Sequence, residues 1–140
     1  MSRVLIGIGN PDRGDDAAGW EVAGRVRGWD ATRTMAGSVE LIDRWDSDDD
    51  VVIVDAMHGG GEVGHVARFD LGGTSLPSGR FTSTHAFGPA ELGELARVLG
   101  RLPASLTVIG IEAGTTGLGE AMSPPVADAV NQVVKELDHA

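Results

Sequence analysis

The chain has 140 residues, 41% of them hydrophobic, and it contains no cysteine. This length suits one domain with a single core, and the lack of cysteine excludes disulfides, thiolate metal sites and a cysteine nucleophile. Eleven basic residues against 21 acidic ones give a formal net charge of −10, which makes nucleic acid an unfavourable partner.

The sequence shows no sign of a membrane segment. No apolar run is long enough to cross a bilayer, and the N-terminus lacks the apolar stretch and cleavage site of a secretory signal. We therefore expect a cytoplasmic protein without a membrane partner. Because no element has a long apolar face left over, we expect a monomer.

Apolar runs of strand length alternate with amphipathic stretches, which is typical of an α/β domain with a largely parallel sheet. In chain order, we expect a strand over residues 4–8, a helix over 16–26, a weak strand over 31–35, a short helix over 38–45, a buried strand over 51–54, a half-exposed and antiparallel strand over 65–69, a loop over 71–79, a helix over 89–99, a strand over 106–111 and a helix over 124–137. Ser123 before Pro124 is a strong start signal for the last helix, with Ser123 as its N-cap. The prediction is a single α/β domain over residues 1–140, with a mostly parallel five-stranded sheet between helices.

Functional groups in such sheets gather at the carboxyl ends of the parallel strands. The polar residues that we expect there are Asn10, Asp12, Asp15, Asp16, Asp55, His58, Ser83, Thr84, His85 and Glu112. These side chains could converge on one crevice that carries carboxylates and one or two imidazoles.

The first strand runs into a glycine turn with the sequence GIGNPDRGDDAAG, which invites comparison with nucleotide-binding loops. Gly7 and Gly9 begin the dinucleotide fingerprint, but Asp12 occupies the position of its third glycine, and no Gly-Lys-Ser follows. A pyrophosphate beside Asp12, Asp15 and Asp16 would face strong like-charge repulsion. The turn therefore does not bind a nucleotide.

The carboxylates of this turn have a structural and a functional interpretation. Acidic residues in the first turn of a helix cap free N–H groups and interact favourably with the helix dipole, and we expect one of Asp15 and Asp16 to do only that. Asp55 follows a run that should be buried, so its charge needs a partner or a function. The acidic run over residues 46–50 is expected to be a solvated loop.

With His85, two of these carboxylates form a candidate metal-binding set. Asp16, Asp55 and His85 offer hard and borderline donors that suit a divalent transition metal with open coordination positions. His58 is a rival imidazole, and Asp15 could replace Asp16. His65 falls within an expected strand, which favours a structural role in the sheet.

Four blocks of the chain, in order, resemble the hydrogenase maturation proteases. Residues 6–19 (IGIGNPDRGDDAAG) are similar to the family pattern GxGNxxxxDDGxG, and residues 51–57 (VVIVDAM) are similar to VxxVDA. Residues 83–88 (STHAFG) resemble (S/T)xHxxG before a leucine-rich helix. Residues 109–112 (IGIE) with 119–124 (GEAMSP) resemble GIEP…G…LS.

The resemblance implies both a fold and an activity. The fold is a twisted, mostly parallel sheet between helices, of the phosphorylase/hydrolase-like type. The activity is removal of the C-terminal extension from the large-subunit precursor of a nickel–iron hydrogenase, which would be the partner of this chain. The substrate would carry the nickel, and Asp16, Asp55 and His85 would bind it, so no tightly bound cofactor of the chain's own is expected.

The resemblance leaves the catalytic step and the specificity open. Either Asp16 or Asp55 could act as general base, or the nickel could activate the water as a Lewis acid. Asp16 stands where many members have Glu, and Ala113 replaces the proline that follows Gly-Ile-Glu. Alternatives are a stand-alone metal-dependent peptidase or amidohydrolase, and a non-catalytic module that binds the precursor.

Overall fold

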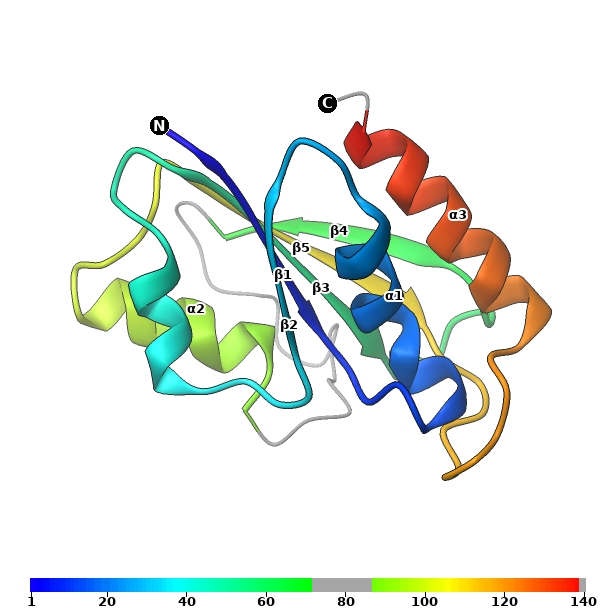
Figure 1. The fold of residues 1–140 in the computed structure, drawn as a ribbon. Coiled ribbons are helices and arrows are strands. Elements are labelled where there is room, and N and C mark those ends of the chain that lie inside the picture. The colour runs from blue at the N-terminus through cyan, green and yellow to red at the C-terminus, as the bar shows by residue number, and fades with distance from the viewer. Residues whose placement is uncertain (72–86, 139–140) are drawn as a thin grey trace.

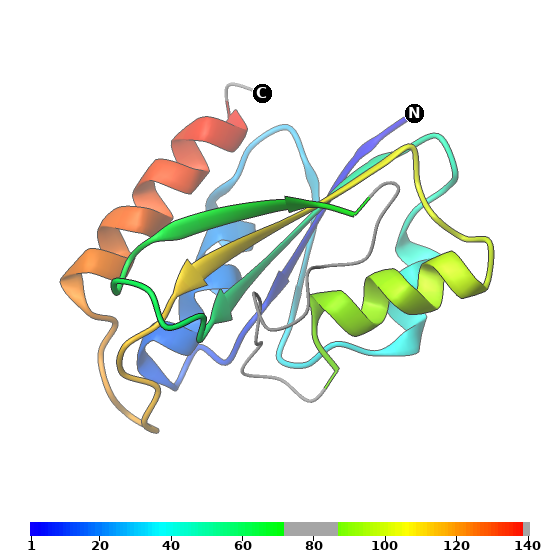
Figure 2. The ribbon, with the colours of Figure 1, turned by 180° about the vertical axis from the view of Figure 1, so that it is seen from behind.

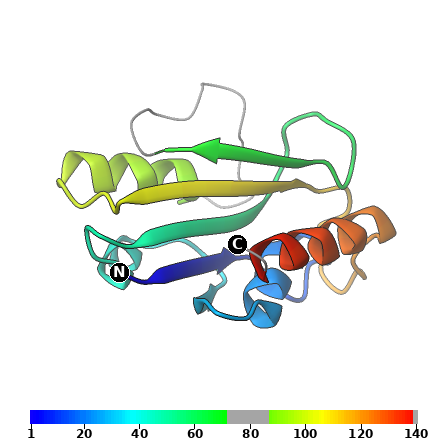
Figure 3. The same ribbon diagram turned by 90° about the horizontal axis from the view of Figure 1, so that it is seen from above.

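The computed structural model describes residues 1–71 and 87–138 and contains one five-stranded sheet. The strands are β1 (Arg3–Ile8), β2 (Asp30–Thr34), β3 (Asp50–Met57), β4 (Val66–Asp70) and β5 (Ser105–Glu112). Their order across the sheet is β2-β1-β3-β5-β4, and only β4 is antiparallel to its neighbour (Figures 1 and 3). The predicted mostly parallel sheet, including its antiparallel strand, is confirmed.

Helices cover both faces of the sheet. They are η1 (Gly14–Ala17), α1 (Ala18–Arg25), η2 (Val39–Arg44), α2 (Pro89–Val98) and α3 (Pro124–Asp138), where η marks a 3₁₀ helix. Figures 1 and 2 show η2 with α2 on one side of the sheet and α1 with α3 on the other. Within residues 1–71 and 87–138, no helix is long and apolar enough to cross a membrane.

Two apolar cores result from the alternation of side chains along the strands. Ile6 and Ile53 belong to the core beneath η2 and α2, which also includes Leu92 of α2. Their neighbours Leu5 and Val54 point to the other face and join the core of α1 and α3. Because each such side chain is fully buried, each stabilises the fold by roughly 1.5–3 kcal/mol.

The structure corrects several predicted boundaries. The third strand does not end at residue 54, because β3 pairs in register with β5 as far as Met57 opposite Glu112. Asp55 and Glu112 therefore lie within strands rather than beyond them. His65, which we predicted within a strand, precedes β4, and the helix predicted over 16–26 is divided into η1 and α1.

Part of the predicted pattern lies outside the described residues. This applies to Ser83, Thr84 and His85, and to the loop predicted over 71–79 beyond residue 71. The structure therefore does not test those predictions.

A close contact between glycines sets the position of α1 over the sheet. A Cβ atom on Gly19 of α1 would lie 2.3 Å from the carbonyl oxygen of Val54 and 2.4 Å from that of Ile8. A Cβ atom on Gly7 of β1 would lie 2.1 Å from the carbonyl oxygen of Gly19. The α1 backbone thus rests directly on β1 and β3, which puts η1 at the carboxyl end of these strands.

Asp49 organises the opposite edge of the sheet. This buried carboxylate accepts hydrogen bonds from the backbone N–H groups of Ser2 (2.7 Å) and Asp46 (2.8 Å). The hydrogen bonds from the backbone N–H groups of Asp46 and Ser2 lower the pKa of the Asp49 carboxyl. The exposed Asp46 and Asp48 lie close to it, and Asp48 pairs with the N-terminal ammonium group at 3.2 Å. The acidic run over residues 46–50 thus binds the N-terminal segment. Asp46 and Asp48 are exposed, as predicted, whereas Asp49 is buried.

Replacement of Gly19 by Ala should destabilise the protein by roughly 3 kcal/mol, because the new methyl group meets two rigid backbone oxygens. Urea unfolding measures the loss. Gly93→Ala in α2 is the matched control, because its methyl group meets mainly the flexible end of Leu71 and alanine favours a helix. Equal stability of the two variants would contradict the close-contact explanation.

Replacement of Asp49 by Asn should lower stability at neutral pH and much less in acid. A carboxyl whose pKa is lowered by folding stabilises the protein above its unfolded-state pKa, and this contribution is lost as pH falls through the folded-state value. Urea unfolding at about pH 7 and about pH 3 should show the difference between variant and wild type shrinking in acid. The exposed Asp128 on α3 provides the control variant, Asp128→Asn.

Candidate functional site

The candidate site lies at the carboxyl edge of the sheet. Asp55 of β3 is 0% exposed, and Asp16 of η1 is 4% exposed. By strand alternation Asp55 shares the face of Ile53, which η2 and α2 cover. Because η1 follows β1 and contacts β3, the structure brings Asp16 and Asp55 to the same edge.

The strand residues beside Asp55 are small. Its neighbour in register on β5 is Gly110, which has no side chain, and the residue paired with Gly110 on β4 is Ala67. The row that runs from Asp55 to the edge of the sheet therefore consists of small residues. His85, the third member of the predicted set, lies outside the described residues, so the complete set stays a prediction.

Asp16 is held by the turn that precedes η1. The backbone N–H of Asn10 donates to the carbonyl oxygen of Asp16 at 3.2 Å and lies 3.3 Å from its carboxylate Oδ2. The N–H of Asp16 donates to the carbonyl oxygen of Arg13 at 3.0 Å. The glycine turn thus folds back on η1 and surrounds the Asp16 backbone.

Asp15 has a different role from the one predicted. Neither η1 nor α1 has a side-chain cap. The Asp15 carboxylate is 0% exposed and accepts hydrogen bonds from the N–H groups of Gly114, Thr115 and Ser123 and from the Ser123 hydroxyl. These four donors outweigh the single hydrogen bond of a helix cap. Both oxygens of Asp15 are thus engaged by the segment over residues 114–123.

Ser123 also contacts Asp15, which the sequence did not predict. Pro124 is the first residue of α3, as predicted, and the Ser123 hydroxyl donates to Asp15. No local pattern pointed to this bond, because the two residues are 108 positions apart in the chain.

Glu112 also anchors a loop. It is buried at the end of β5 and accepts hydrogen bonds from the N–H groups of Gly59 (3.0 Å) and Gly61 (3.2 Å). The loop after β3 is therefore fixed to the end of β5. His58 and His65 are both exposed near this loop, so neither is enclosed with Asp55.

A pocket of about 300 Å³ opens beside Glu112 at the carboxyl edge of β3 and β5. Met57, which lies two residues beyond Asp55 on the same face of the sheet, contributes to this edge pocket. The other lining residues are Gly59, Gly61, His65, Ala67, Arg68, Phe69 and Glu112.

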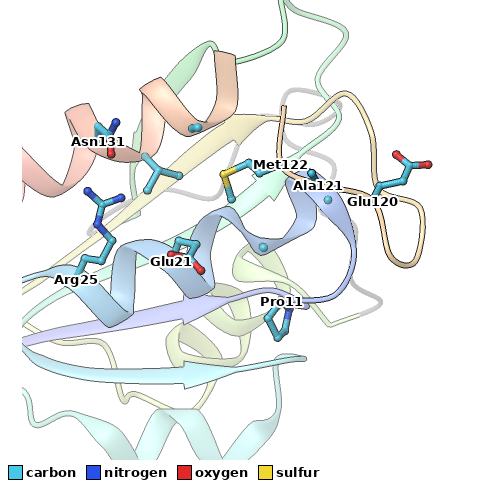
Figure 4. Close-up of a pocket in the computed structure, with 11 residues that line it drawn as sticks. Pro11, Glu21, Arg25, Glu120, Ala121, Met122 and Asn131 are labelled. Carbon is cyan, nitrogen blue, oxygen red and sulfur yellow. The ribbon is translucent and has the colours of Figure 1, made fainter. Parts of the chain in front are cut away.

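A second pocket, of about 360 Å³, lies between α1 and α3. Gly14 and Ala17 of η1, which flank the two aspartates, line one side of this α1–α3 pocket. Figure 4 shows Arg25 of α1 and Asn131 of α3 facing each other at one end, with Met122 between the helices. Neither Asp16 nor Asp55 lines this pocket.

The chemistry of the carboxyl edge follows from its donors. Buried carboxylates are costly unless they meet cations or hydrogen-bond donors. Two carboxylates at one edge of the sheet suit a divalent metal. An imidazole would add a nitrogen donor to these oxygen donors. Carboxylates in this setting can also accept a proton from water.

Comparison with known proteins agrees with this geometry. The family model described as hydrogenase maturation protease matches residues 36–139, a range that includes Asp55 and His85 but not Asp16. No curated protein sequence matches the chain.

Several solved structures share the fold. The [NiFe] hydrogenase maturation protease HybD from Thermococcus kodakarensis is 22% identical, with a TM-score of 0.73 over 99% of this chain and 98% of its own. The endopeptidase HycI from Escherichia coli is 23% identical, with a TM-score of 0.73 over 99% and 90%. The [NiFe] hydrogenase maturation protease HycI from Thermococcus kodakarensis KOD1 is 29% identical, with a TM-score of 0.71 over 99% and 90%.

The family match covers well over half of the chain, and the structural matches extend over nearly all of it. The strand order is that of a mostly parallel sheet, which the resemblance implied. Asp16 and Asp55, which belong to two of the blocks that carry the resemblance, are buried at the carboxyl edge of this sheet. This chain therefore belongs to the hydrogenase maturation protease family, a family of endopeptidases.

Proposed function

We propose that this chain removes the C-terminal extension of a nickel–iron hydrogenase large-subunit precursor after nickel has been inserted. The observation that carries the proposal is the pair of buried carboxylates, Asp16 and Asp55, at the carboxyl edge of the sheet. The chain that carries them belongs to the hydrogenase maturation protease family. The partner is the precursor itself, and its nickel arrives as part of the substrate.

Asp16, Asp55 and His85 are the residues that we propose bind the nickel. Two carboxylates and an imidazole provide donors that a divalent transition metal accepts. In the absence of the metal, the two carboxylates and the precursor have little mutual attraction, because a buried carboxylate needs a cation or a hydrogen-bond donor as its partner. Recognition of the substrate is thereby tied to completed nickel insertion, and the chain needs no tightly bound cofactor of its own.

Cleavage is the hydrolysis of one peptide bond. A water molecule attacks the carbonyl carbon, the carbon–nitrogen bond breaks, and the proton taken from the water passes to the leaving amine. Asp16 or Asp55 accepts that proton first, since both lie at the site and carboxylates serve as general bases. The bound nickel supplies positioning of the scissile bond and polarisation of its carbonyl group.

Replacement of Asp16 or Asp55 by Asn, or of His85 by Ala, should reduce cleavage of a nickel-loaded precursor by about 100-fold or more. Intact-mass spectrometry of the precursor follows the release of its extension. The control is Asp12→Asn, an exposed position in the same turn, which should cleave at the wild-type rate. Circular dichroism establishes that each variant is folded. Wild-type rates in all three site variants would refute the assignment.

Removal of nickel from the precursor should abolish cleavage, and the purified protease should contain far less than one metal ion per chain. Elemental analysis of the freshly purified chain and parallel assays with nickel-free and nickel-loaded precursor measure both. A tightly held, stoichiometric metal would instead indicate a stand-alone metal-dependent peptidase or amidohydrolase. Binding of the loaded precursor without cleavage would indicate a non-catalytic module.

A further inference from the structure

We propose that Asp15 is a positioning residue for Asp16, because it ties η1 to the segment over residues 114–123. We call this arrangement the Asp15 clamp: the Asp15 carboxylate with its donors on Gly114, Thr115 and Ser123. The inference rests on the proposed function of Asp16 and assigns a role to the neighbouring aspartate, which does not itself meet the substrate.

The clamp saturates a buried carboxylate. Oδ2 accepts the N–H groups of Gly114 at 2.8 Å and Thr115 at 3.1 Å, and Oδ1 accepts the N–H of Ser123 at 2.7 Å. The Ser123 hydroxyl lies 2.9 Å from each oxygen. Hydrogen bonds to an ionised acceptor are about twice as strong as those between neutral groups, so this contact holds the 114–123 segment firmly.

Backbone hydrogen bonds reinforce the clamp on both sides of Asp15. The Asp15 N–H donates to the carbonyl oxygen of Thr115 at 2.7 Å, and the Gly14 N–H donates to that of Glu120 at 3.1 Å. The Gly119 N–H donates to the carbonyl oxygen of Asp12 at 2.7 Å. These bonds join the two segments at three further points.

Gly14 makes this contact possible. Its φ of +54° lies in the left-handed region, and a Cβ atom there would lie 2.5 Å from the Thr115 carbonyl oxygen. A glycine at this position therefore lets the chain enter η1 against the Thr115 backbone.

Asp16 depends on the clamp because η1 has little stability of its own. This 3₁₀ helix has four residues and no side-chain cap, and such short helices rely on tertiary contacts. Asp16 is the residue that follows Asp15 in η1. A displacement of the η1 backbone would therefore carry the Asp16 carboxylate with it.

The clamp also connects the site to the α1–α3 pocket. Glu120, Ala121 and Met122, which line that pocket, belong to the segment that Asp15 holds (Figure 4). A displacement of the segment would change the pocket wall and the start of η1 at the same time.

Asp15→Asn is the central variant. The amide has the shape of the carboxylate but replaces one acceptor oxygen by an NH₂ group, which would face a backbone N–H in either orientation. Supporting residues around a metal site typically contribute about 10- to 100-fold to affinity or activity. We therefore expect kcat/KM for the nickel-loaded precursor to fall by about 10- to 100-fold.

Asp49→Asn is the matched control. Asp49 is also a buried aspartate that binds the N–H groups of a loop, but it lies at the opposite edge of the sheet. Both variants should lower the urea midpoint, and only Asp15→Asn should lower kcat/KM at a temperature where both remain folded. Ser123→Ala removes a single donor of the clamp and should fall between wild type and Asp15→Asn.

The outcomes separate the clamp from the proposed function. If wild type cleaves, Asp16→Asn does not, and both Asp15→Asn and Ser123→Ala cleave like Asp49→Asn, the clamp proposal is wrong and the proposed function stands. If wild type itself fails to cleave loaded precursor, the proposed function is wrong. Should Asp15→Asn fail to fold, an unchanged kcat/KM in Ser123→Ala alone overturns the clamp proposal.

Discussion

The candidate site exists because the backbone of α1 rests directly on β1 and β3. Gly7 and Gly19 provide this contact, in which a single methyl group would overlap the carbonyl oxygens of the neighbouring strands. A helix held further from the sheet, at the usual distance that side chains impose, would carry η1 away from the carboxyl ends of the strands. Asp16 and Asp55 share one edge because no side chain lies between the backbones at the Gly7–Gly19 contact.

The buried carboxylates of this protein fall into two groups. Asp15, Asp49 and Glu112 each accept hydrogen bonds from backbone N–H groups of loops, and each fastens a segment that has no regular structure. Asp16 and Asp55 are the two carboxylates that the family resemblance assigns to the metal, and Asp16 follows Asp15 directly in η1. Burial alone therefore does not identify a functional carboxylate, because Asp15 is as deeply buried as Asp55 and yet contacts the backbone of another segment.

The sequence predicted the fold well because its signals are local. Apolar runs predicted β1, β3 and β5, alternation predicted β4, and β2 was expected only as a weak strand. The pair Ser123-Pro124 marked the start of α3. Asp55 and Glu112 were placed beyond their strands, since a charge interrupts the apolar run, while the ladder between β3 and β5 continues past it. The role of Asp15 could not be predicted, because its donors lie about 100 residues away and include backbone groups of any residue type.

Ala113 stands where the family pattern has proline. The chain after β5 is held at this point by hydrogen bonds instead of by a proline ring. The N–H of Ala113 donates to the carbonyl oxygen of Met57 at 3.0 Å, so it extends the ladder between β3 and β5 by one residue. Proline lacks this donor but fixes φ, which stiffens the chain by itself. In this chain the next two N–H groups, of Gly114 and Thr115, turn towards Asp15. The glycine-rich segment that follows is therefore held at its start by the sheet and by the clamp, and the rigidity that proline would provide comes from hydrogen bonds to two neighbouring elements.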